Sequence, residues 1–70
     1  MFIQVDDHAF VDELCAHFTR SGFGAEPVGG GMVGVSRPDA PSEEQQRREV
    51  ILHLQLWNVL NPDAAAEVVP

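Results

Sequence analysis

The side chains of this chain that are best suited to catalysis or metal binding are one cysteine and three histidines, Cys15, His8, His17 and His53. His8 and His17 are nine positions apart, which places them on opposite faces of one helix, so they cannot share a metal ion in that conformation. His17 and His53 can approach across two helices, but neither has a second histidine at i,i+4 or the spacing of a zinc protease. We therefore expect no metal site.

Cys15 falls on the apolar side of a predicted helix. A reactive thiol needs an electropositive, partly exposed setting, whereas a free cysteine on an apolar stripe is typical of a core. The carboxylates of Asp6, Asp7, Asp12 and Glu13 are expected to cap a helix and to line its solvated face. Because no nucleophile and base can be assembled from local spacing, we expect no catalytic residues and no enzyme.

Three consecutive glycines, Gly29–Gly31, raise the question of a phosphate-binding loop. No Gly-Lys-Ser/Thr follows them, and the next segment, 32–36, has the pattern of a strand and not of a helix whose N-terminus holds an anion. Glycines also tolerate the positive φ angles of tight hairpins. We therefore predict a turn between two strands, and no cofactor.

Charge and length exclude several classes of partner. Eleven acidic residues against four basic ones give a formal charge of −7, which disfavours nucleic acid and anionic membrane surfaces. No apolar run reaches the ~20 residues of a membrane span, and the start of the chain lacks the features of a signal peptide. We expect a cytoplasmic protein, and because all four basic residues are arginine, a bacterial one with a GC-rich genome.

The segments that must position these side chains follow the order β-α-β-β-α. A strand is predicted at 2–5, a helix from Asp6 or Asp7 to Gly22, two strands flanking the glycines, and a helix over 42–60. A right-handed crossover makes the first two strands parallel, and the third fits between them. The expected fold is a two-layer α+β domain, ferredoxin-like but lacking its last strand, with a three-stranded sheet of order 1-3-2 and two helices on one face.

The whole chain, 1–70, is expected to form a single small domain, with a folded body over 1–61 and a short turn or frayed tail over 62–70. The outer edge of the first strand is then unpaired, which invites β-augmentation by another chain. One cysteine allows no internal disulfide, so oligomerisation is the simplest extra source of stability for so small a domain.

The last predicted helix has more apolar surface than a small core needs. On a helical projection its apolar residues spread over roughly 220° of arc, about twice what covers one side of such a core. Trp57 lies on this arc and is either a core residue or an interface residue. The residues predicted to make contact with a partner are Phe2 of the first strand and, on the helix, Leu52, Leu56, Trp57, Val59 and Leu60.

Some features match small prokaryotic domains. The helix ending in Ser21-Gly22, the strand Val33-Gly34-Val35 and the helix opening Glu43-Glu44-Gln45-Gln46 resemble PII-like signal-transducing βαββα domains. A Leu-x-x-Trp-x-x-x-x-Pro pattern, carried by Leu54, Trp57 and Pro62, is similar to that of short uncharacterised actinobacterial proteins. The resemblance implies a ferredoxin-like topology and a regulatory or partner-binding role, and it carries no catalytic motif.

Two functions from different classes remain. The first is a non-enzymatic interaction or regulatory module that homodimerises or binds another protein through its last helix or its first-strand edge. The alternative is a ferredoxin-like sensor of a small ligand, with a site where the glycine-rich hairpin meets a neighbouring subunit.

Overall fold

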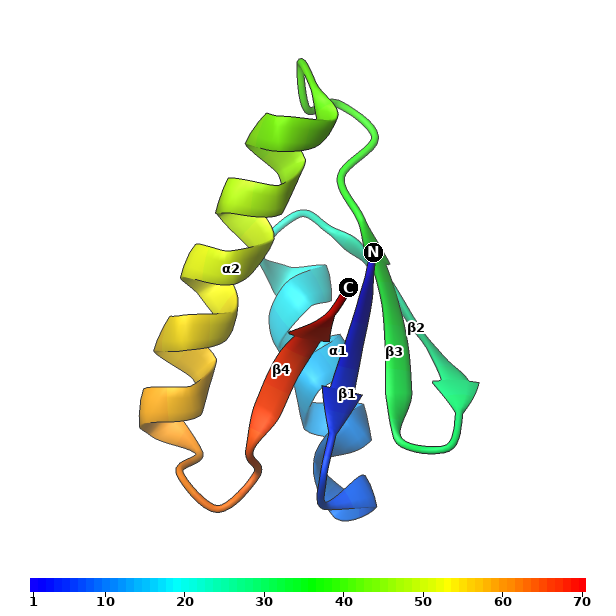
Figure 1. Cartoon of the computed structure of the whole chain (residues 1–70), viewed down its shortest axis with the longest axis vertical. Coiled ribbons are helices and arrows are strands. Elements are labelled where there is room, and N and C mark those ends of the chain that lie inside the picture. The colour runs from blue at the N-terminus through cyan, green and yellow to red at the C-terminus, as the bar shows by residue number, and fades with distance from the viewer.

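The computed structural model describes every residue, 1–70. Its elements alternate as β-α-β-β-α-β along the chain (Figure 1). They are β1 (Phe2–Val5), the short 3-10 helix η1 (His8–Phe10), α1 (Val11–Arg20), β2 (Gly24–Gly29), β3 (Met32–Ser36), α2 (Glu43–Leu60) and β4 (Ala66–Val69).

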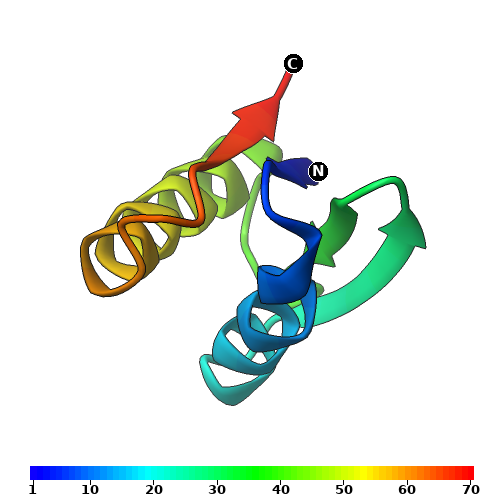
Figure 2. The same cartoon turned by 90° about the horizontal axis from the view of Figure 1, so that it is seen from below.

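The four strands form one antiparallel sheet in the order β2-β3-β1-β4. Both helices cover the same face of this sheet, and the other face is left open (Figure 2). The α+β class is therefore confirmed. The three-stranded sheet is wrong, because β4 adds a strand beside β1 and completes the ferredoxin-like element order.

The fourth strand corrects two further expectations. Residues 62–70, predicted as a turn or frayed tail, contain β4, which pairs with β1 from Phe2↔Val69 to Val5↔Ala66. The edge of the first strand is thus occupied within the chain and is not free for β-augmentation. Chain reversal after α2 uses Ala65 at φ +50°, a left-handed conformation that non-glycine residues seldom adopt.

One side chain of α2 holds the start of β4 in place. The amide of Asn58 donates through Nδ2 to the carbonyl of Ala66 at 2.8 Å, and its Oδ1 accepts from the N–H of Ala66 at 3.2 Å. Asn58 therefore satisfies both backbone groups of one residue, as a neighbouring strand would. Asn61, the residue that ends α2, donates from Nδ2 to the carbonyl of Trp57 at 3.1 Å and so closes the last turn of the helix before β4.

Replacing Asn58 tests this clamp. We expect Asn58→Ala to lower the free energy of unfolding by about 2 kcal/mol, since two part-buried backbone groups lose their partners. Asn58→Asp keeps an acceptor for the N–H of Ala66 but sets an oxygen against its carbonyl, so we expect it to be no more stable than the alanine variant. Urea unfolding of both variants checks this. A free energy equal to that of the wild type would show that β4 is held by other contacts.

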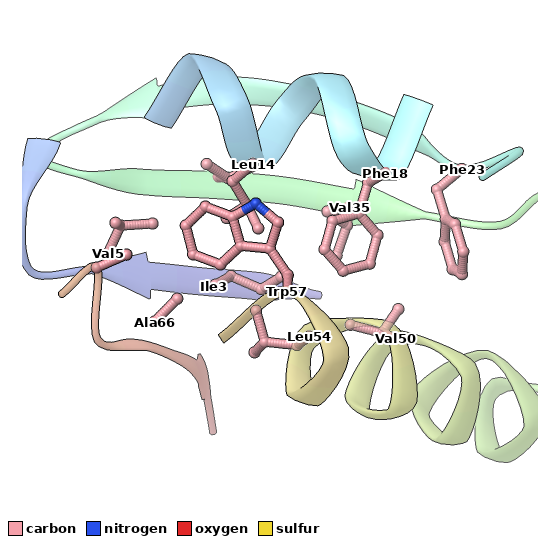
Figure 3. Close-up of a cluster of buried hydrophobic side chains, with 12 residues drawn as sticks. Ile3, Val5, Leu14, Phe18, Phe23, Val35, Val50, Leu54, Trp57 and Ala66 are labelled. Carbon is pink, nitrogen blue, oxygen red and sulfur yellow. The ribbon is translucent and has the colours of Figure 1, made fainter. Parts of the chain in front are cut away.

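The core lies between the helices and the sheet, and Trp57 is at its centre (Figure 3). Trp57 projects from α2 toward α1, is 2% exposed, and meets the ring of Phe10 edge-on at a centroid distance of 6.1 Å. Val50 and Leu54 are buried on the same side of α2. These three residues set the rotation of the helix about its axis.

Several local signals in the sequence are confirmed. Ser42 caps α2 by accepting from the N–H of Gln45 at 3.1 Å, as the capping box predicts. Gly22 ends α1 at φ +92°. The three glycines form the β2–β3 turn with positive φ angles, which confirms the hairpin. Pro27 lies on β2, an edge strand of the sheet, where its missing N–H costs nothing.

Candidate interaction surface

The outward side of α2 carries a continuous apolar stripe. Leu52, Leu56, Val59 and Leu60 follow the i, i+4, i+7, i+8 spacing of one helix face. Their exposed fractions are 65%, 53%, 76% and 66%. We call these four residues the outer stripe. It points away from the core side of the helix, so α2 is apolar on two opposite faces.

The helix segment that carries the outer stripe is itself free of charged residues. No Asp, Glu, Lys or Arg occurs in residues 50–62. The nearest charged side chain before the stripe, Glu49, is paired with Arg37 at 3.0 Å, and Arg48 is paired with Glu44 at 3.0 Å. A protein with a formal charge of −7 thus keeps one apolar surface free of its negative charge.

The six residues predicted to contact a partner do not form one surface. Trp57 belongs to the core, which resolves the open alternative and removes it from the exposed set. Phe2 is 48% exposed, but it lies on the open face of the sheet, away from both helices. The outer stripe retains the other four.

A polar hollow adjoins the end of the outer stripe where α1 and α2 come together. Its volume is about 280 Å³. It is lined by Glu13, Ala16, His17 and Arg20 of α1 and by Trp57, Leu60 and Asn61 at the end of α2. Leu60 belongs to both surfaces, so a partner that covers the outer stripe also reaches this hollow.

Two histidines meet between the helices near this hollow. The rings of His17 and His53 have centroids 5.8 Å apart, and both rings contact Phe18. The Nε2 atom of His17 and the Nδ1 atom of His53 are buried without a hydrogen-bond partner. The two rings thus approach each other across the helices, as their positions in the sequence allow. No three His, Cys, Asp or Glu side chains converge as a metal-binding group.

The environment of His17 disfavours its charged form. Burial lowers the pKa of His17 below the ordinary value for histidine, and the nearby His53 and the guanidinium of Arg20 lower it further. In the unfolded chain the same imidazole takes up a proton near pH 6.5. As the pH falls below that point the unfolded state binds more protons than the folded state, so stability falls with it.

Acidification therefore tests the environment of His17. We expect the free energy of unfolding to decrease between about pH 7 and about pH 5, above the range in which most carboxylates titrate. The variant His17→Gln, which cannot titrate, should lose a large part of this decrease. Urea unfolding at a series of pH values measures both chains. An identical pH dependence in the two would show that His17 is protonated in the folded protein as readily as in the unfolded chain.

Cys15 is a free, half-buried thiol that packs against the core. Burial raises the pKa of Cys15, and the carboxylate of Asp12 raises it further. The thiol is therefore protonated at neutral pH and is a poor nucleophile.

Two structural features of the candidate surfaces were not apparent from the sequence. The Asn58 clamp on Ala66 joins positions eight apart and belongs to no known capping pattern. The open face of the sheet also carries a groove beside Phe2 and Gly34. The alternation of Val33 and Val35 with Gly34 indicates that Gly34 lies on the face opposite the core. The strands on either side of β3 are determined by long-range pairing, which no local pattern predicts.

Comparison of the chain with protein-family models, with curated proteins and with solved structures finds no match. Neither helix combines the length and apolar character needed to cross a bilayer.

Proposed function

We propose that this protein is a small, non-enzymatic module that forms a homodimer through the outer stripe of α2. The observation that carries the proposal is an exposed apolar face on a helix whose opposite face already fills the core. A chain of this size buries a smaller share of its surface than larger domains do. Covering the outer stripe adds apolar burial that the isolated chain lacks.

A second copy suits this surface because the surface is uncharged. Two molecules that each carry a formal charge of −7 repel one another unless they meet where those charges are absent. Residues 50–62 are such a place. A twofold axis across α2 sets the outer stripes of two molecules against each other as an antiparallel helix pair.

The small size of the outer stripe indicates that the dimer has a low affinity. From Leu52 to Leu60 the helix rises about 12 Å. Four side chains over that length cover less than the ~800 Å² per partner of a standard interface. We therefore expect a reversible dimer with a dissociation constant on the order of tens of micromolar. A self-associating module of this kind fits the cytoplasmic regulatory role expected from sequence.

Variants on the two faces of α2 separate this proposal from a purely structural role. We expect Leu56→Asp to remain folded and to be monomeric at several hundred micromolar, because a carboxylate cannot be buried unpaired in an apolar interface. Leu54→Asp places the same group in the core, and we expect it to unfold the chain. Light scattering gives the molar mass, and urea unfolding at low micromolar concentration gives the stability.

Gln55→Asp is the matched control, because it adds the same charge on the same turn but off the outer stripe. We expect this variant to associate much as the wild type does. If Leu56→Asp has the same molar mass in solution as the dimeric wild type, the outer stripe is not the dimer interface. If it unfolds the chain as Leu54→Asp does, the stripe belongs to the core.

A further inference from the structure

The open face of the sheet carries a second surface that the proposed dimer does not use. A groove of about 460 Å³ runs along β2 and β3 beside the N-terminal end of β1. Side chains that point to this face include Phe2 and Val28, which are 48% and 50% exposed. Three other lining residues, Gly24, Gly34 and Ser36, are small and form the floor, and Gly34 lies between Phe2 and Val28.

The pairing of the strands gives the groove its width. Glu26, Gly34 and Phe2 lie in one row across β2, β3 and β1. Glu26 and Phe2 are two strand spacings apart, roughly 10 Å. Gly34, between them, contributes no side chain. A Cβ atom at this position would meet Val28 Cγ1 at 3.6 Å and Phe2 Cε1 at 3.7 Å, so those two side chains border the floor without filling it.

The charge of this face differs from that of the outer stripe. Glu26 and Glu67 are both exposed here, and none of the strand residues on this face is Lys, Arg or His. The amino group of Met1 is the cation at one end of the groove, and it donates to the carbonyl of Val35 at 3.2 Å. A second copy would bring two more carboxylates and no Lys or Arg to this face, whereas a cationic partner would pair with Glu26.

We propose that the groove binds an arginine side chain that another protein presents next to an apolar residue. The aliphatic stem lies over Gly34, and the guanidinium lies between the ring of Phe2 and the carboxylate of Glu26. Arginine suits both neighbours, because its planar head stacks on aromatic rings and pairs with carboxylates. The adjacent apolar side chain packs on Val28. This site is independent of the proposed dimer, since it uses the other side of the molecule.

A labelled peptide of alternating arginine and leucine tests the site by fluorescence anisotropy. The matched probe replaces each arginine with citrulline, which has the same shape and no charge. We expect the arginine peptide to bind the wild type and Leu56→Asp equally, and the citrulline peptide to bind at least tenfold more weakly. Phe2→Ala and Glu26→Gln should each weaken binding of the arginine peptide several-fold, and added salt should weaken it further.

Gly34→Val is the sharpest variant, because it fills the floor of the groove without changing the charge. Its Cβ alone lies at ordinary van der Waals distance from Val28 and Phe2, the exposed side chains of these two residues can move aside for the Cγ atoms, and valine favours strands, so we expect the chain to fold and to lose the peptide. Glu13→Gln, which removes one negative charge from α1 on the helical side, should leave binding unchanged. Circular dichroism checks the fold of each variant, and if Gly34→Val fails to fold, the comparison of Glu26→Gln with Glu13→Gln decides.

Three results would overturn the proposal. Equal binding by Glu26→Gln and Glu13→Gln would show that the peptide responds to the net charge of the chain and not to Glu26 in the groove. Equal affinity for the citrulline peptide would mean that the groove selects apolar surface and not a cation. A lower molar mass for Gly34→Val than for the wild type would assign the groove to a second copy.

Discussion

The burial of Trp57, Val50 and Leu54 on one side of α2 is the constraint from which the exposed surfaces follow. An 18-residue helix packed on a sheet can place one face in the core, and the largest side chain selects which. Once Trp57 meets Phe10 inside, the residues on the opposite side of the same turns must face solvent. On this helix they are leucines and a valine, so the rotation that completes the core also creates the outer stripe.

The sheet adds a second constraint, because both helices cover the same face. The strands then alternate between a buried set, with Ile3 and Val33 among its members, and an open set that includes Phe2 and Gly34. The last strand extends the open face, since the Asn58 clamp holds Ala66 and sets β4 beside β1. The molecule thus has two uncovered apolar regions of different charge. One is uncharged and suits a second copy, and the other is bordered by Glu26 and suits a cation.

Much of this architecture could be predicted from local sequence. The capping box at Ser42, the helix end at Gly22 and the glycine turn depend on residues a few positions apart, and all three are confirmed. The excess apolar surface of the last helix was equally visible. The sequence did not show which of these apolar residues face the core and which face solvent. An arc of more than 200° contains two possible core faces, and only the packing of Trp57 selects one.

The missed features depend on long-range pairing. The segment Ala66–Val69 is four residues long, which is too short for an alternation of apolar and polar side chains to distinguish a strand from a tail. It becomes a strand because β1 offers an unpaired edge and Asn58 fixes its first residue. The groove on the open face likewise needs the register that sets Glu26, Gly34 and Phe2 in one row. No local pattern carries that register.

The central claim is that the outer stripe is covered by a second copy of the chain, and sedimentation equilibrium of the wild type tests it most directly. From a few to several hundred micromolar, the account predicts that the weight-average mass rises from one chain toward two and stops there. A single 7.7 kDa species across the whole range would contradict it.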